Sequence, residues 1–201
     1  MTRFQSGLRS AAALAAAVAI SGCVNLGGGK PPAMLLTITP AASLSSDASR
    51  STSAADAITV GVPAVPQAIA VTRVAVAESP VAISYVKDAV WVEPPARLFQ
   101  RLLAETIAAK TGKVVVDPRQ LSAAAGAQLT GTLLSFGIDA QRQQAVVVYD
   151  ASISRDSGSK IETRRFESRI SVAAIDAASI GSPLNQAANK VATDVAIWIG
   201  K

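Results

Sequence analysis

Alternating apolar and polar residues in the second half of the chain constrain its fold more than any other feature. Residues 134–139 alternate with a period of two, and the same period returns at 166–172. Between them, residues 145–149 are apolar throughout, which is typical of a strand covered on both faces. The polar connections at 139–144 and 155–160 predict hairpin loops. These three segments should therefore form an antiparallel meander.

Two other segments show the three- to four-residue period of an amphipathic helix. The first begins after Glu93 with two prolines, which a first helical turn tolerates, and should end near Gly112. The second should begin at Ser182 and Pro183 and close at Gly200. The apolar face of the second helix is predicted at Leu184, Ala188, Val191, Val195 and Trp198.

Shorter apolar segments in the first half of the chain predict further strands. They are 33–39, 58–62, 68–77, 82–86, 89–92 and 113–116. The stretch 40–56 is rich in Ser and Ala and is expected to be a flexible loop. Two helices on such a sheet give an α+β fold of two layers, with a mostly antiparallel sheet packed by two main amphipathic helices.

The N-terminus has the three parts of a secretory signal. Arg3 and Arg9 form a basic region, an apolar run of about ten residues follows, and small residues precede Cys23. That run is half of the roughly 20 residues that a membrane-spanning helix needs. We therefore expect a signal peptide at 1–22, a Gly- and Pro-containing linker at 23–32, and a folded domain at 33–201.

The residues around the predicted cleavage point resemble the bacterial lipobox. Ile20, Ser21 and Gly22 provide one bulky aliphatic and two small residues before Cys23, whose thiol would form the thioether to diacylglycerol. The resemblance implies a mature N-terminus that carries fatty acyl chains, palmitate among them, and two or more chains hold a protein firmly on a membrane. Val24 stands where an aspartate would favour the inner membrane. The expected location is therefore the periplasmic face of the outer membrane.

Composition excludes several classes of function. The chain contains no histidine and one cysteine, so an imidazole base, a histidine metal ligand, an internal disulfide and a cysteine-based zinc site are all excluded. Removal of Arg3 and Arg9 lowers the formal net charge from +5 to +3, which is too small a surplus to predict nucleic-acid binding. The carboxylates form no close-spaced pair. We therefore predict no catalytic residue, no metal ligand and no cofactor.

The order of elements resembles the ABC-type transport auxiliary lipoprotein family, which includes the lipoprotein of the paraquat-inducible system. The residues that carry this resemblance are 34–37, 58–66, the run Trp91, Val92, Glu93 and Pro94 before the first helix, and 196–199. The resemblance covers about residues 33–201. It implies a non-enzymatic auxiliary component that works with an ATPase, a permease and a mammalian-cell-entry (MCE) domain protein. It also implies movement of lipid between the two membranes.

Two basic residues are the candidates for partner contact. Arg165 and Arg169 should share one face of a strand, with Glu167 between them. This face is either a solvated sheet surface or a docking patch for an acidic partner or lipid headgroups. Trp91 and Trp198 are interpreted as core residues, with recognition as the alternative for Trp91. An exposed sheet edge could also support self-association into a homo-oligomer.

A second function remains open on the sequence alone. An outer-membrane assembly or lipopolysaccharide-insertion lipoprotein that supports a β-barrel would have the same leader and a similar domain. Neighbouring genes would separate the two, because an MCE-domain gene supports transport and a barrel gene supports assembly.

Overall fold

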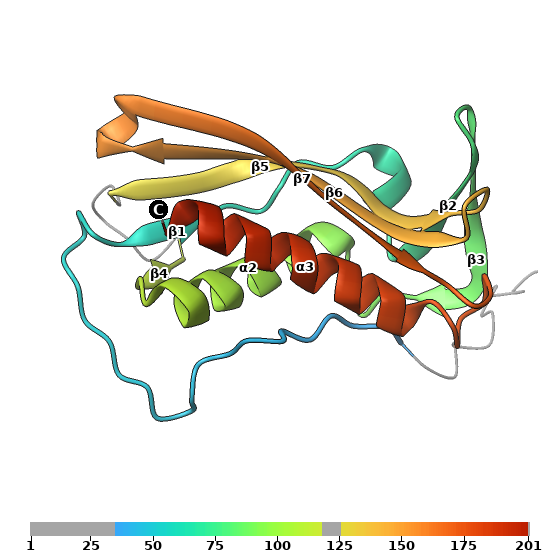
Figure 1. The fold of residues 1–201 in the computed structure, drawn as a ribbon, viewed down its shortest axis with the longest axis horizontal. Helices are drawn as coiled ribbons and strands as arrows, with labels where there is room; N and C mark the ends of the chain where they lie inside the picture. Colours follow the sequence, from blue (N-terminus) through green and yellow to red (C-terminus); the bar gives the residue numbers. More distant parts are fainter. Residues whose placement is uncertain (1–34, 118–125, 201) are drawn as a thin grey trace, which may run out of the picture. The chain divides into compact units, whose positions relative to one another are not determined.

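The computed structural model describes residues 35–117 and 126–200, which form a sheet with two helices packed on one face (Figure 1). The elements follow one another along the chain as β1 (Ile58–Val60), β2 (Arg73–Ser79), β3 (Ala82–Val90), α2 (Pro95–Thr111), β4 (Val115–Val116), β5 (Ala127–Asp139), β6 (Gln144–Arg155), β7 (Lys160–Ser171) and α3 (Gly181–Ile199). Short 3₁₀ turns, η1 (Gln67–Ile69) and η3 (Asp156–Gly158), precede β2 and β7. The predicted α+β fold of two layers is confirmed.

The long strands β5, β6 and β7 form the predicted antiparallel meander. The side of β5 that does not pair with β6 has two partners, because β5 is longer than either of them. β1 pairs with its first residues and β2 with its last. Both of these pairs are parallel, as is the pair β1–β4, whereas β2 and β3 form an antiparallel hairpin. The sheet within the described residues is therefore mixed, with its longest ladders antiparallel.

The first half of the chain departs from the predicted strands in two places. The predicted strand at 33–39 is reduced to a single bridge between Leu36 and Trp91, after which the chain leaves the sheet. The backbone amides of Thr39 and Ala41 donate to the side-chain oxygens of Asn185 and Asn189 in α3. These hydrogen bonds hold the segment that follows Leu36 against the helix layer. The predicted strand at 68–77 begins instead as η1, and regular pairing starts only at Arg73.

The segments 82–86 and 89–92 form one strand rather than two. β3 runs from Ala82 to Val90, and the polar step between the predicted pieces is a bulge with Asp88 at a φ of 59°. β2 and β3 stay paired before and after the bulge, because Tyr85 lies opposite Ala75 and Val90 lies opposite Arg73. A bulge absorbs extra residues in one strand without ending the ladder.

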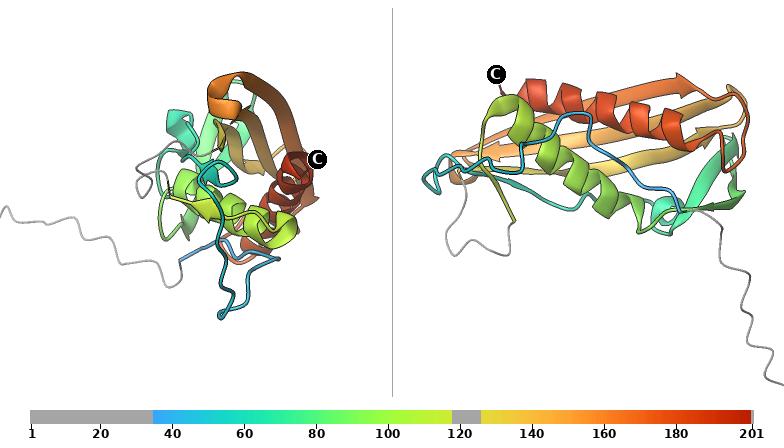
Figure 2. Two further views of the ribbon diagram at one scale, coloured as in Figure 1. Left: turned by 90° about the vertical axis from the view of Figure 1, so that its left-hand side faces the viewer. Right: turned by 90° about the horizontal axis from the view of Figure 1, so that it is seen from below.

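Both helices lie where the apolar period predicted them. Pro94 and Pro95 stand at the start of α2, and Gly112 ends it in the left-handed conformation with a φ of 73°. α3 begins one residue before Ser182, so that Ser182 lies inside the first turn and Ile180 takes the capping position without a side-chain bond. Its end at Gly200 is as predicted. Views from the side and from below show the two helices next to each other beneath the sheet (Figure 2).

Four aromatic side chains at the centre of the core contact one another edge to face. The ring centroids of Trp91 and Phe136 are 5.4 Å apart, those of Phe136 and Phe99 are 6.3 Å apart, and those of Phe99 and Tyr149 are 5.2 Å apart. Trp91 is 1% exposed, which confirms its interpretation as a core residue. Small residues on α3, among them Ala188 and Ala192, are fully buried and let the helix approach its neighbours closely.

Residues 40–56 form no helix or strand, and hydrogen bonds attach this segment to α2. The Leu44 amide donates to the carboxylate of Glu105 at 2.7 Å, and the Arg50 guanidinium donates to the Ala108 carbonyl at 2.7 Å. The flexibility expected of this loop stays a prediction. No helix in the described ranges is long and apolar enough to cross a membrane.

Candidate partner-binding surface

The face of β5–β7 that points away from the helices is polar and exposed. On β6, Tyr149 and Ile153 point into the core, whereas the alternate residues, Asp150 among them, are half-buried on the opposite face. The register places Arg165 of β7 beside Asp150. The predicted continuous burial of this strand is therefore correct only for its first residues, 145–147. We call this exposed side of β5, β6 and β7 the outer face.

Arg165 and Asp150 form a two-pronged ion pair across the outer face. The Nε and Nη2 atoms of Arg165 each donate to one carboxylate oxygen of Asp150 at 2.6 Å. This pairing lowers the pKa of Asp150, chiefly through the hydrogen bond from Arg165. The Arg165 side chain is still 61% exposed, so its guanidinium stays accessible from solvent.

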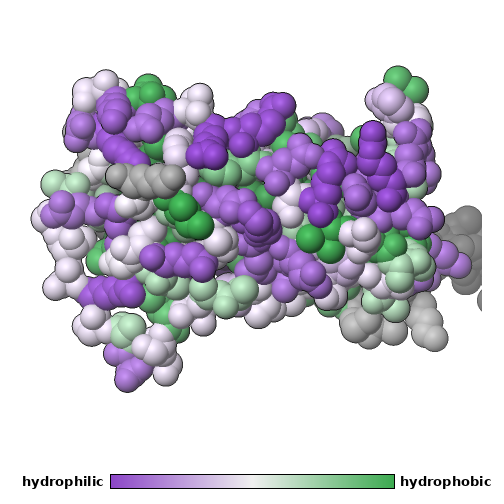
Figure 3. Space-filling model, in the orientation of Figure 1, coloured by the Kyte–Doolittle hydropathy of each residue, from purple (hydrophilic) through white to green (hydrophobic). Residues whose placement is uncertain are grey.

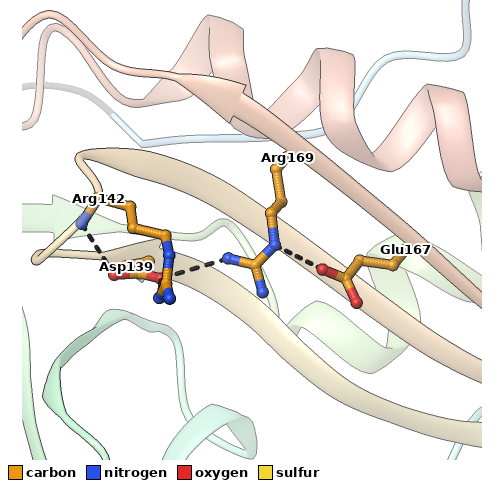
Figure 4. A network of polar contacts seen from close by, with 4 residues as sticks. All are labelled: Asp139, Arg142, Glu167 and Arg169. Carbon is orange, nitrogen blue, oxygen red and sulfur yellow. Dashed lines mark hydrogen bonds and ion pairs between the residues drawn. The ribbon is translucent and has the colours of Figure 1, made fainter.

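Arg169 lies between two carboxylates, one from its own strand and one from β5 (Figure 4). Its Nε donates to Glu167 at 2.5 Å and its Nη1 donates to Asp139 at 3.2 Å. Asp139 also accepts from the backbone amide of Arg142 at 3.1 Å and from its guanidinium at 3.0 Å. Desolvation alone would raise the pKa of Asp139, but the hydrogen bonds from the two arginines outweigh it and lower the pKa.

The outer face therefore carries alternating charge and no net positive charge. Three arginines, Arg142, Arg165 and Arg169, are matched by three carboxylates, Asp139, Asp150 and Glu167. The register confirms that Arg165 and Arg169 share one face of β7, whereas their contact with a partner stays a prediction. The sequence did not indicate Asp150 and Asp139 as their partners, because these contacts join residues far apart in the chain.

A groove lies where the end of α3 passes under the edge of β7. It has a volume of about 370 Å³ and is lined by Arg164, Arg165, Phe166, Glu167, Asp194, Ile197 and Trp198. The rings of Phe166 and Trp198 are 5.6 Å apart, and the guanidinium of Arg164 lies 5.2 Å from the Phe166 ring. Trp198 is thus half-buried at the rim of the core, which corrects the prediction that it belongs to the core proper.

The outer face offers recognition chemistry more readily than proton transfer. Asp139 and Asp150 have lowered pKa values, so both carboxylates are ionised at neutral pH and are poor proton donors. No group of His, Cys, Asp and Glu residues that could hold a metal ion occurs within residues 35–117 and 126–200. Guanidinium and carboxylate groups held at fixed positions can instead form hydrogen bonds and ion pairs with a partner.

The other predicted site residues lie at the N-terminus. Cys23, together with Ile20, Ser21 and Gly22, falls outside the residues that the structure describes. The lipid anchor therefore stays a prediction from the sequence.

Comparison with solved structures shows that this fold occurs elsewhere. Protein XCC0632 from Xanthomonas campestris superposes with a TM-score of 0.62 at 17% identity, covering 84% of this chain and 92% of its own. A crystal structure described as that of an uncharacterized protein gives a TM-score of 0.60 at 16% identity, covering 71% and 90%. At these identities the likeness concerns the fold alone.

Comparison of the sequence itself is more specific. Among curated proteins no match is found. The family described as the ABC-type transport auxiliary lipoprotein component matches residues 36–196, from the bridge at Leu36 through most of α3. Because the match spans nearly the whole folded domain, this chain belongs to the ABC-type transport auxiliary lipoprotein component family.

Proposed function

We propose that the protein is a non-enzymatic lipoprotein on the periplasmic face of the outer membrane and serves an ABC/MCE system that moves lipid between the two membranes. The observation that carries the proposal is the family match over residues 36–196. The leader with Ile20, Ser21, Gly22 and Cys23 supports the lipid anchor. The absence of histidine supports a role in binding rather than in chemistry.

The length of the tether bears on which partner the domain can meet. Residues 23–32 are about ten residues and span at most about 30–35 Å when fully extended. Anchored in the outer membrane, the domain would stay close to that membrane. Its partner must therefore bridge the periplasm from the permease and ATPase, as an assembly of MCE-domain proteins would.

The outer face is the surface that we propose for this contact. Its arginines are exposed and already paired with carboxylates, so a partner meets a fixed pattern of charge. Such patterns contribute more to the specificity and rate of association than to raw affinity. Arg169 contacts both Glu167 and Asp139, and reversal of its charge would disturb the largest part of the pattern.

Cross-linking in intact cells followed by mass spectrometry tests the partner. The unaltered protein should yield an MCE-domain protein, and Arg169→Glu should reduce its yield. Arg97→Glu makes the same change of charge on an exposed position of α2 and should leave the yield unchanged. Recovery of a β-barrel alone, while the MCE protein is expressed, would reject this proposal in favour of the assembly lipoprotein.

Metabolic labelling tests the anchor separately. Cells grown with a radioactive fatty acid should label the protein, and Cys23→Ser should abolish the label because only the thiol forms the thioether. Labelling of the Cys23→Ser protein at the parental level would refute the anchor assignment.

A further inference from the structure

The edge of β7 presents a long unpaired row of backbone groups. β7 has 12 residues and, among the described strands, pairs with β6 alone. Figure 1 shows it at the margin of the sheet, in front of β6 and above α3. Proteins commonly protect such an edge from pairing with other chains by placing charged side chains on it.

The register identifies which backbone groups are free. The amide of Val172 donates to the carbonyl of Gln143 at 2.9 Å, so this pair belongs to the hydrogen-bonded set of the β6–β7 ladder. Hydrogen-bonded and non-hydrogen-bonded pairs alternate along an antiparallel ladder. The even-numbered residues of β7 therefore bond to β6, and the odd-numbered residues from Ile161 to Ser171 direct their amides and carbonyls outward.

The side chains of these odd-numbered residues alternate in charge rather than repeating one sign. In the middle of the strand they are Arg165, Glu167 and Arg169. If a second β7 is laid antiparallel with its centre at Phe166, Arg165 of each copy lies opposite Glu167 of the other. Centring the pair on Arg165 or on Glu167 instead places like charges opposite each other. Opposite charges across a strand pair are stabilising, and like charges are destabilising.

The helix side of the same edge carries a small apolar patch at the point where the two copies would meet. Phe166 would lie on the two-fold axis, and the groove beside it contains Trp198 and Ile197, which is 53% exposed. Figure 3 shows the surface over β7 and α3 as mostly hydrophilic, with a small hydrophobic patch near the end of α3. Pairing would bring this patch next to its copy and remove both from water.

We propose that the protein forms a two-fold dimer in which the β7 strands of two copies pair antiparallel, centred on Phe166, and join their sheets into one. The backbone groups of the odd-numbered residues form the hydrogen bonds. Two symmetric ion pairs between Arg165 and Glu167 stabilise this register. The apolar patch beside Phe166 distinguishes it from a pair centred on Ser168, in which Arg169 of each copy would lie opposite Glu167 of the other. The ion pairs use Arg165 and Glu167, which also belong to the outer face, so the dimer is measured on the purified protein, apart from the contact proposed above.

Charge reversal with rescue tests the register. Native mass spectrometry of the full-length chain, released from detergent, should show a dimer for the unaltered protein. Arg165→Glu and Glu167→Arg should each raise the dissociation constant at least about tenfold, because each replaces two attractive pairs by two repulsive ones. The double variant Arg165→Glu/Glu167→Arg should dimerise again. Arg97→Glu is the matched control and should dimerise like the parent.

Three results of that experiment would overturn the proposal: a monomeric parent, an Arg165→Glu variant that dimerises like the parent, or a double variant that is folded and stays monomeric. Circular dichroism reports whether each variant folds. If the double variant is unfolded, the cross-link described next decides the proposal by itself.

Disulfide cross-linking in intact cells provides the independent measurement. Arg164 of one copy would face Ser168 of the other in a non-hydrogen-bonded pair with Cα atoms about 4.5 Å apart, which suits a disulfide. Arg164→Cys/Ser168→Cys should therefore give an oxidant-dependent dimer. Within one chain these positions are four strand residues apart, about 13 Å, which is too far to bridge.

The parent, with Cys23 alone, and Glu162→Cys/Arg164→Cys, which matches a different register, serve as controls and should give no dimer. A dimer from the second control but not from Arg164→Cys/Ser168→Cys would overturn the register. Cross-linking of Arg164→Cys/Ser168→Cys only to another protein would show that β7 pairs with a foreign strand, and the proposed dimer would be wrong.

Discussion

Tyr149 shows how one residue of β6 links the core to the sheet. Its side chain is fully buried, its ring contacts Phe99, and its hydroxyl donates to the carbonyl of Thr130 at 2.8 Å. Burial raises the pKa of the phenol well above its ordinary value of 10.0. The folded state therefore holds the neutral form at a pH at which an unfolded chain would release the proton.

Replacement of Tyr149 by Phe should lower stability at neutral pH and should lower it less at alkaline pH. At neutral pH it should lower the free energy of unfolding by about 1–2 kcal/mol, because the Thr130 carbonyl loses its donor. The contribution that the raised pKa makes to stability is complete below pH 10 and is lost as the pH rises beyond it. The melting temperature of the parent should thus fall more steeply than that of the variant between about pH 9 and 11.

Tyr85→Phe is the matched control for this alkaline effect. Tyr85 is half-buried on β3, where the guanidinium of Arg73 lies 3.7 Å from its ring centroid. This variant should keep the parent's alkaline loss, because Tyr149 is intact. Parallel slopes for the parent and Tyr149→Phe would refute the assignment.

At the scale of elements, α3 joins the helix layer to the sheet. It packs on β6, β7 and α2, and its Asn185 and Asn189 also hold the chain at Thr39 and Ala41. Its alanines let it lie close to the sheet, and Leu184, Val191 and Val195 fill the remaining space. A change on its buried face should therefore disturb both layers at once.

Val191→Asp should be among the most damaging single substitutions in the protein. Val191 is 0% exposed, so the new carboxylate would lie in the core without a partner. The expected loss is several kcal/mol, roughly 3–5, unless the acid takes up a proton. Chemical denaturation should show it as a lower midpoint. Gln186→Asp, on the exposed side of the same helix, is the control and should change stability by less than about 0.5 kcal/mol.

At the scale of the whole molecule, the core lies within the family-matched residues 36–196 except for Ile199, which lies just beyond them. Of the described residues, the buried core runs from Ile58 to Ile199, with Leu36 and Ile38 packed against it. The tether and the leader precede all of these residues in the chain. We therefore expect the folded domain to need neither.

A chain that begins at Ala33 should be soluble and should unfold in one cooperative transition. A thermal or urea melt followed by circular dichroism and by tryptophan fluorescence would test this, because Trp91 reports on the core and Trp198 on its rim. Coincident curves from both probes are the expected result. A broad transition, or curves that separate, would show that residues before Ala33 contribute to the fold.

Local pattern by itself determined the meander of β5–β7, both helices, the fold class and the common face of Arg165 and Arg169. These follow from the two-residue period of strands and the 3.6-residue period of helices, which are properties of neighbours in the chain. Prolines at 94 and 95 and Gly112 likewise set the ends of α2 through their own backbone preferences.

Only the tertiary structure decided the parallel pairing of β1 and β2 with the two ends of β5, the departure of the chain from the sheet after Leu36, and the neutral charge of the outer face. Each depends on contacts between residues far apart in sequence, such as Asp150 with Arg165, Asp139 with Arg169, or Asn189 with Ala41. A local pattern shows which face a side chain takes. It does not show which strand comes to lie beside it, and therefore not which charge will meet it.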